Sequence, residues 1–395
     1  MKKLILTAAV LPLVAAGITG CSASGITKVA QMADQARKVQ KTAATVEQVT
    51  GQDMGMIADP LNMKGRAEAA EAAATAETVA ALENAAPISA APMAVEMRKT
   101  SGKTKVLSMR PKLAIVGYNV AAFTEGKVKG TARGGLFGNS QGASSTMELI
   151  SSGIDAGLVQ RVADAASDDL VAQLTAAGFD VVEPYGVSQA ANNSVMKAGA
   201  APMMRKLMTY KGEKMNAIVA GPSTYGFRVV NSGVAKGGFA GLSEIGGNAP
   251  AKLGAELDAV LVQPTIVLDF ANMKANRTIG TKATSSAELA FSLDPMSSIQ
   301  VHASKGKGLN WLTYGTKKGA ASDAPFAILG DKDSKSNSLE QGLGAALGMG
   351  VRNKKTTTQS VIIDSERYEA LALSAAKGWN TAFVAQAVAA RTAQS

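Results

Sequence analysis

The chain is poor in the side chains that hold metals or cross-link a fold: it has one cysteine and one histidine among 395 residues. A transition-metal centre needs three or four convergent nitrogen or sulfur ligands, so the composition excludes one. A single cysteine also excludes an internal disulfide. No calcium loop with alternating acidic residues is present, and we therefore expect no bound metal.

Aromatic residues are also scarce, at 4% of the chain, although the formal charge is +10. Proteins that bind nucleic acids combine positive charge with stacking aromatics or a recognised motif, and this sequence offers neither, so we expect no nucleic-acid partner. No GxxxxGK[ST] phosphate loop is present, and we expect no cofactor. The positive charge instead suits an anionic membrane surface or an acidic partner.

The N-terminus has the form of a secretory signal. Lys2 and Lys3 precede an apolar run from Leu4 to Ile18, which is too short for a permanent membrane span. The run ends in the residues ITGC, with the cysteine at Cys21. These residues resemble the lipobox of bacterial lipoproteins, which implies a signal peptide over residues 1–20 and acylation of Cys21. Ser22 stands where an aspartate would retain such a lipoprotein in the inner membrane, so the resemblance implies anchoring in the outer membrane, on its periplasmic face.

Residues 21–105 are predicted to be a helical and linker region. Apolar residues between Ile26 and Thr50 recur at three- and four-residue spacing, which predicts an amphipathic helix that packs on the body or self-associates. The segment Arg66–Ala86 is rich in alanine and glutamate and favours a helix that buries little. Small residues and prolines over 87–105 indicate a linker, so we expect the folded domain to run from 106 to 395.

The domain begins with an apolar run, Leu113–Val120, that is typical of a buried central strand. A helix with apolar residues on one face follows over 158–178, and then a strand over Phe179–Tyr185, so the two strands are expected to pair in parallel. A second unit is predicted from a helix over Ser188–Met208 and a strand over Met215–Pro222. The apolar strand Leu257–Phe270 contains Pro264, which suggests a bulge or an edge position.

The C-terminal half predicts antiparallel strands and a long helix. Short strands over Ser286–Leu293, Ser298–Ser304 and Leu309–Gly315 are separated by turns and predict a meander. A helix is expected over Ser365–Arg391, with Asp364 as its N-cap. The predicted fold class is α/β: a mixed sheet with crossover helices, an antiparallel meander and a long C-terminal helix, preceded by an alanine-rich helical N-terminal region.

The order of these segments resembles the periplasmic domain of the curli secretion-channel lipoproteins. The residues that carry the resemblance are the apolar opening strand, a glycine-rich segment, the helix that follows it, and the strands FDVVE at Phe179–Glu183 and DAVLV at Asp258–Val262. The resemblance implies a structural or assembly component of an envelope secretion or surface-structure system. Its implied partners are outer-membrane lipid, through Cys21, envelope proteins and further copies of the chain.

One segment departs from that family. The family's membrane-spanning hairpins are expected as alternating strands of about nine to eleven residues. The insertion Gly126–Gly153 is rich in glycine and irregular, so we expect it not to form such a hairpin. An accessory lipoprotein is therefore expected rather than a channel.

A serine hydrolase is a competing interpretation. The segment Gly138–Gly142 matches GxSxG around Ser140, and His302 is the one available base, with Asp258, Asp269 or Asp294 as the acid. The residues before Ser140 are too few for the required strand, however, and those after it open a helix poorly. His302 alternates with apolar residues, which predicts the solvated polar face of a strand. We therefore expect no enzymatic activity and no catalytic residue.

A third interpretation is a binding module for an anionic envelope glycan. Its candidate residues are the lysines around the segment KGKG, namely Lys305, Lys307, Lys317 and Lys318. Solvated hairpin loops explain the same lysines without a ligand.

Cys21→Ala is expected to release the protein from the membrane, because the thiol is the proposed point of lipid attachment. The measurement is the share of the protein in the membrane fraction after cell breakage, with Ser24→Ala as the matched control that keeps it there. An unchanged membrane fraction for Cys21→Ala would contradict the lipid anchor.

Overall fold

A computed structural model describes most of the C-terminal three quarters of the chain. The described residues are 79–133, 143–187, 195–197, 202–208, 213–226, 228–230, 249–275, 277–279, 283–305, 308–336 and 353–393. All belong to one compact unit, Glu68–Ser395. The expected signal peptide, Cys21, Ser140 and the two segments predicted as N-terminal helices lie outside the described residues, apart from a helical segment at 79–83.

The structure contains two main sheets. The large sheet has eleven strands: β1 (Glu96–Gly102), β2 (Lys112–Ile115), β3 (Asn119–Phe123), β6 (Asp180–Val182), β8 (Met203–Met208), β9 (Lys214–Ala220), β11 (Ala259–Ala275), β13 (Ser285–Leu293), β14 (Ser298–Lys305), β15 (Gly308–Lys318) and β16 (Ala321–Ser322). The small sheet has five, in the order β12 (Arg277–Ile279), β4 (Glu125–Arg133), β5 (Ala143–Ser152), β18 (Asn353–Ile363) and β17 (Ala327–Ser336). A separate pair joins β7 (Val195–Lys197) to β10 (Arg228–Val230).

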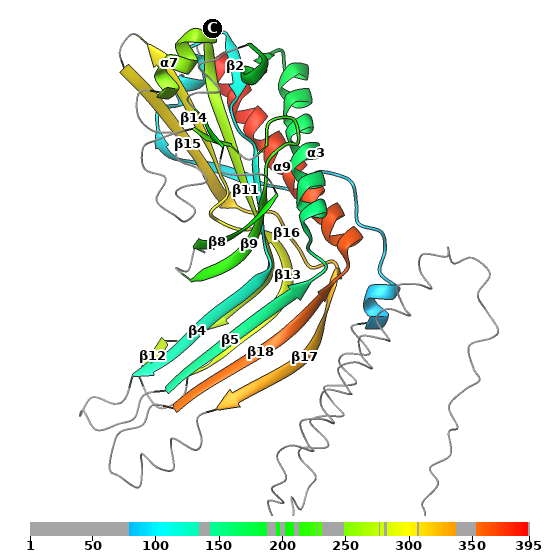
Figure 1. Cartoon of the computed structure of the whole chain (residues 1–395). Helices are drawn as coiled ribbons and strands as arrows, with labels where there is room; N and C mark the ends of the chain where they lie inside the picture. The colour runs from blue at the N-terminus through cyan, green and yellow to red at the C-terminus, as the bar shows by residue number, and fades with distance from the viewer. Residues whose placement is uncertain are drawn as a thin grey trace, which may run out of the picture. The chain divides into compact units, whose positions relative to one another are not determined.

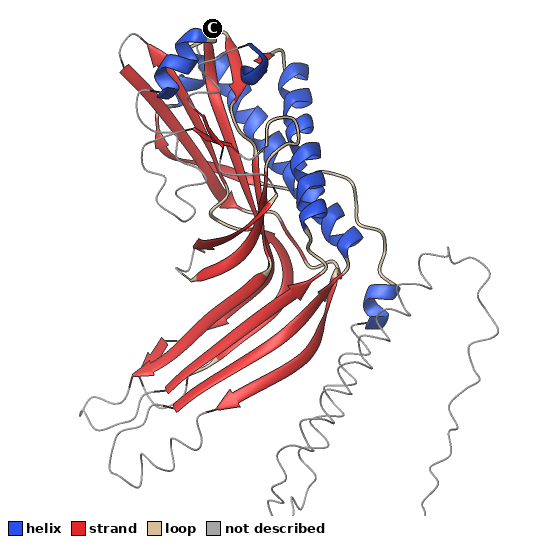
Figure 2. Cartoon of the chain, viewed as in Figure 1, coloured by secondary structure: helices blue, strands red, loops and turns tan. Residues whose placement is uncertain are grey.

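Helices cover the large sheet, whereas the small sheet is built from strands (Figure 2). The helices are η1 (Thr104–Ser108), α3 (Ala156–Ala176), α4 (Pro184–Val187), α7 (Ala249–Glu256) and α9 (Ser365–Thr392). Helices α3 and α9 lie side by side against one face of the large sheet, and α7 packs on β11 and β14 (Figure 1). The predicted α/β class, with a mixed sheet and a long C-terminal helix, is confirmed.

Local sequence signals place both long helices. Asp155 caps α3 by accepting a hydrogen bond from the Leu158 N–H at 2.7 Å, and Gly178 follows the helix with a φ of 81°. Asp364 caps α9 as predicted, because its carboxylate accepts from the N–H groups of Glu366 and Arg367. The caps satisfy helix N–H groups that have no partner within the helix.

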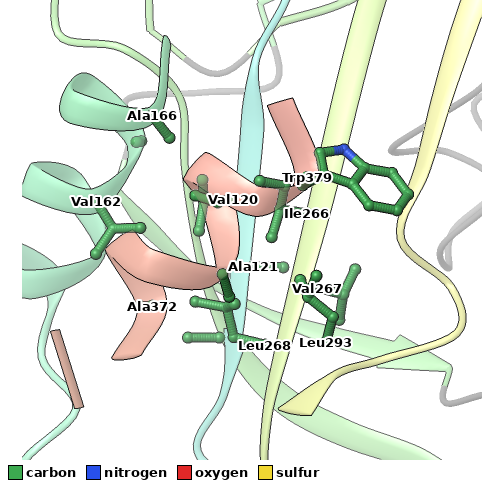
Figure 3. Packing of buried hydrophobic residues seen from close by; sticks show 14 of the residues in the cluster. Val120, Ala121, Val162, Ala166, Ile266, Val267, Leu268, Leu293, Ala372 and Trp379 are labelled. Atoms are coloured by element: carbon green, nitrogen blue, oxygen red, sulfur yellow. The ribbon is translucent and has the colours of Figure 1, made fainter. Parts of the chain in front are cut away.

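The core lies between the large sheet and the two long helices. Figure 3 shows Val162 of α3 and Trp379 of α9 packing with side chains of β3 and β11. The largest fully buried side chains are Trp379, Tyr118, Tyr314, Tyr368, Phe123, Phe270, Phe291 and Phe383. A smaller apolar cluster, which includes Leu253, Leu257 and Leu261, joins α7 to the sheet.

The central strand is β11, and its proline is explained by its neighbours. On one side β11 pairs in parallel first with β2, through residues 259–262, and then with β3, through residues 265–268. Pro264 lies where the neighbour changes from β2 to β3. Proline has no N–H to donate, and on this edge neither β2 nor β3 pairs with Pro264, whereas Ile299 of β14 stands opposite it on the other edge. The predicted edge position is therefore wrong, since Pro264 lies in an interior strand.

Three other predictions need correction. The expected single strand Leu113–Val120 is divided into β2 and β3. Residues 203–208, expected in a helix, form β8, which pairs antiparallel with β9. The strands β13, β14 and β15 lie where expected, and β14 pairs antiparallel with β15. However, β13 pairs with β11 rather than with β14, because the 17 residues of β11 accommodate β14 and β13 one after the other.

The expected linker over 87–105 is also wrong, because most of it belongs to the folded body. Strand β1 pairs antiparallel with β15. Before it, the Met93 N–H donates to the Ser374 carbonyl at 3.0 Å, and Arg367 donates to the carbonyls of Ala85 and Ala86. A Cβ at Gly378 would collide with the Met93 carbonyl, so this approach requires glycine. We call residues 85–95 the strap; the body begins with it rather than near residue 106.

A buried polar network joins α3, α9 and the segment between β2 and β3. The Tyr118 hydroxyl donates to Asn380 Oδ1 at 2.9 Å, and Asn380 Nδ2 donates to the Ala166 carbonyl at 2.8 Å and to Asp169 Oδ2 at 2.9 Å. Tyr118 and Asn380 are fully buried, and burial raises the pKa of Tyr118 well above its usual value. The tyrosine therefore stays protonated and remains a donor at neutral pH.

None of the helices in the described ranges is long and apolar enough to cross a membrane.

Asn380→Ala is expected to lower the free energy of unfolding by about 1–3 kcal/mol, because it leaves the buried Tyr118 hydroxyl without its acceptor. The measurement is the midpoint of denaturant unfolding. The matched control is the neighbouring Thr381→Ala, which removes an exposed hydroxyl and should change stability by no more than about 0.5 kcal/mol. Equal losses for the two variants would contradict this role of Asn380.

Candidate functional site

The small sheet is assembled from two hairpins that lie far apart in the sequence. Strand β4 pairs antiparallel with β5, and β17 pairs antiparallel with β18. The hairpins are joined by parallel pairing of β5 with β18 through ten residue pairs, from Ala143–Asn353 to Ser152–Ile362. The expected irregularity of Gly126–Gly153 is therefore wrong, because its described residues form the β4–β5 hairpin.

The prediction failed because the glycines of β4 occupy regular positions in an alternating strand. Gly126, Val128 and Gly130 lie on one face and are buried, whereas Lys127 and Lys129 point to the other. A Cβ at Gly126 would come within 3.4 Å of Met273 Sδ and the Leu149 side chain, so a small residue suits this contact with β11. Glycine in such places follows from close packing of strands rather than from irregular structure.

The two faces of the β4–β5 hairpin differ in chemistry. Val128, Met147 and Leu149 are buried on the face toward β11 and β13. On the opposite face Lys127 and Glu148 form an ion pair at 2.6 Å, and this pair raises the pKa of Lys127. Ile150 lies on this face too and is 51% exposed.

Each hairpin leads directly into one of the long helices. Strand β5 ends at Ser152 just before α3, and β18 ends at Ile363 just before α9. The Ser365 hydroxyl joins the two turns by donating to the Gly153 carbonyl at 2.7 Å. Gly153 has a φ of 101°, which strongly favours glycine. The parallel strands thus continue into α3 and α9, and the packing of these helices holds the register of the small sheet.

The outer strands of the small sheet have incomplete neighbours within the described part of the chain. Strand β17 pairs with β18 alone, and a register shift between Leu329 and Lys332 interrupts that ladder. At the other edge β12 covers only residues 131–133 of β4. Unpaired backbone N–H and C=O groups at a sheet edge are a template for another strand.

His302 was expected on a solvated face, and the structure shows it buried, with 5% exposure. It lies opposite Leu261 of β11 and Trp311 of β15, on the face that α7 covers. Its Nδ1 has no hydrogen-bond partner, and burial lowers its pKa to about 4. Alternation along β14 correctly predicts which residues share a face, but it does not reveal that a helix covers that face.

The three candidate acids do not form a triad with His302. Asp269 lies further along β11 than Leu261, and the Asp294 N–H donates to the Val267 carbonyl of the same strand. At about 3.3 Å per residue, both positions are roughly 20 Å or more from Leu261. Asp258 pairs with Arg110 at 2.7 Å instead. Ser140 lies outside the described residues. No three His, Cys, Asp or Glu side chains come together as metal ligands in the described ranges.

The lysines proposed for a glycan site are placed only in part. Lys317 pairs with Glu96 of β1 at 3.0 Å, with both side chains largely exposed. Lys305 and Lys318 lie at strand ends, and Lys307 is outside the described residues.

Sequence reasoning missed β17 and β18, which complete the small sheet. Strand β18 has the sequence NKKTTTQSVII, and its threonines and β-branched residues are a usable β signal. The Thr357 and Gln359 side chains are nevertheless buried, at 8% exposure each.

Comparison with known proteins gave no match: no family model, no curated protein and no solved structure is similar to this chain.

Stability is expected to fall on acidification through His302. Burial lowers the pKa of His302 in the folded state from 6.5 to about 4. Between these values the unfolded chain binds a proton at His302 and the folded chain does not, so stability falls as the pH falls. The loss amounts to about 3 kcal/mol by pH 4. His302→Gln should flatten the dependence of unfolding free energy on pH between 6.5 and 5, where this sole histidine dominates. An unchanged slope in the variant would contradict the burial of an uncharged imidazole.

Proposed function

We propose that the chain is a lipoprotein anchored to the outer membrane through Cys21, and that it acts as a structural or assembly component of an envelope secretion or surface-structure system. The observation that carries the proposal is the small sheet. Two separate hairpins form one sheet whose outer strand β17 is paired on one side only among the described strands.

An open edge of this kind favours association with a further copy of the chain. The strand β17 of one copy can add to the β4 side of the next, which is a head-to-tail contact and can close into a ring. The register shift after Leu329 interrupts the ladder with β18, and regular pairing of β17 resumes at Lys332. The joined turns before α3 and α9 keep both hairpins in place before assembly.

A secretion channel is a second candidate, favoured by the lengths of these strands. Strands β4, β5, β17 and β18 have 9, 10, 10 and 11 residues, which fits the 9 to 11 residues of a membrane-spanning strand. The alternation of small or apolar residues with charged ones along β4 supports it. In the isolated chain β11 and β13 cover the apolar face of the β4–β5 hairpin, so spanning a membrane requires that this face be uncovered.

We infer no enzymatic activity. The burial of His302 and the pairing of Asp258 with Arg110 both speak against a hydrolase built on Ser140. The ion pair of Lys317 with Glu96 weakens the glycan-binding alternative.

Head-to-tail pairing of the small sheets is tested with the double variant Lys129→Cys, Lys332→Cys, since both lysines are exposed and lie on β4 and β17. A short thiol cross-linker should give a ladder of dimers, trimers and larger species. Either single variant is the matched control and should remain monomeric on denaturing gels, because only one strand of each contact carries a thiol.

Dimers in a single variant would contradict the head-to-tail arrangement and indicate symmetric pairing of like strands. The size of the detergent-extracted protein gives an independent measurement. A strict monomer would contradict assembly, and a closed ring would support the channel candidate.

A further inference from the structure

A cavity of about 380 Å³ opens where η1 leads into β2, at the end of the large sheet where the C-terminus lies (Figure 1). Two arginines, Arg110 and Arg391, line it together with Ser108. The remaining walls are apolar: Leu107, Met109, Pro111 and Phe179. A volume of this size lies within the range of small-molecule sites.

The Arg391 guanidinium is held against one wall. Its central carbon lies 4.6 Å from the centre of the Phe179 ring, and Nη1 donates to the Gly178 carbonyl at 2.9 Å. No carboxylate in the described part of the chain pairs with it. A guanidinium stacked on a ring keeps its planar orientation and loses little freedom when it binds a ligand.

Arg110 is fixed more completely. Its Nε and Nη2 donate to the Ser304 carbonyl at 3.3 and 3.0 Å, and Nη1 donates to Asp258 Oδ1 at 2.7 Å. Each terminal nitrogen carries a second hydrogen, so donors remain after these bonds are made. The cavity therefore has two positioned cations and one neighbouring carboxylate, which leaves one positive charge in excess.

Each arginine has a structural role on its own. Arg391 lies in the last turn of α9, where a cation is favoured by the helix dipole, and Arg110 ties β2 to β14 and to the end of α7. Asp258 compensates the charge of Arg110, so the charge in excess at the cavity is that of Arg391. An anion bound beside Arg391, within reach of the remaining donors of Arg110, would balance it.

The apolar walls narrow the class of ligand. Leu107 and Phe179 are buried beneath the cavity, whereas Met109 is partly exposed and Pro111 is exposed, so these two form the accessible apolar surface beside the arginines. A purely inorganic anion would leave this surface uncovered, whereas an uncharged apolar molecule would leave the positive charge uncompensated.

We propose that this cavity binds a small organic carboxylate, with its carboxylate group at Arg391 and Arg110 and its apolar part on Met109 and Pro111. The site is separate from the small sheet and does not depend on the assembly proposed above.

The test uses the full-length protein and 1-naphthoate as the probe, followed by isothermal titration calorimetry against a detergent-matched blank. We expect a dissociation constant of about 1 mM or lower. Arg391→Gln should weaken binding at least tenfold. Arg161→Gln is the matched control: it removes an equal charge from an exposed site roughly 25 Å away along α3, and it should leave the affinity unchanged.

A second variant, Met109→Glu, places a negative charge in the cavity and should weaken binding to a similar extent. Unchanged affinity in both variants would overturn the proposal. Equal binding of the uncharged 1-naphthalenemethanol would overturn the role of the arginines. Full displacement of naphthoate by an equal concentration of inorganic phosphate would overturn the role of the apolar walls.

Discussion

The structure depends on the burial of β11 on both of its faces. Its first ten residues, Ala259–Leu268, are all buried, so the strand needs cover above and below and a neighbour on each side. Parallel strands β2 and β3 pair with one edge, and antiparallel strands β14 and β13 pair with the other. Helix α7 covers one face, while α3 and α9 cover the opposite one. The sheet is mixed because β11 pairs with two parallel strands along one edge and with two antiparallel strands along the other.

The second organising feature is the pair of helices α3 and α9, which run side by side in the same direction. Polar contacts link them along their length, from Arg161 with Glu369 to Asn380 with Asp169. The strands that precede them, β5 and β18, are also parallel neighbours. The molecule thus repeats one local arrangement, a strand followed by a helix, from two regions about 200 residues apart in the sequence. The position of the small sheet is therefore set by α3 and α9, which pack on the large sheet.

Much of the α/β core could be predicted because its signals are local. The caps at Asp155 and Asp364 and the apolar run of β11 depend on neighbouring residues alone. The cover on a sheet face is a different matter, since it depends on distant segments. The same alternation of polar and apolar residues gives a solvated face in one protein and, around His302, a face hidden beneath α7. The strap was predicted as a linker for a similar reason: its backbone bonds, the contacts of Arg367 and the packing of Ile88, Met93 and Val95 on the core all involve segments far away in the sequence.

The hairpins of the small sheet show the opposite problem. Their residues do alternate, but Gly126 stands where a larger apolar residue would make the strand recognisable, and β18 relies on threonine and glutamine. Packing against β11 selects the small residue, and pairing between chain-distant strands supplies the rest of the order. Both the packing against β11 and the pairing of distant strands involve residues far apart in the sequence, so a local sequence pattern does not reveal them.

The strap also decides how a mechanical load would travel through the molecule. If Cys21 carries the proposed lipid, the anchor connects to the body through residues 85–95, and tension on the chain would reach Arg367, Ser374 and the Met93–Gly378 contact before it reaches β1. All three positions lie on α9, which is also the helix that continues from β18. Tension from the lipid would therefore be borne by the α9 backbone, and the ladder between β1 and β15 would be strained only after these contacts had broken.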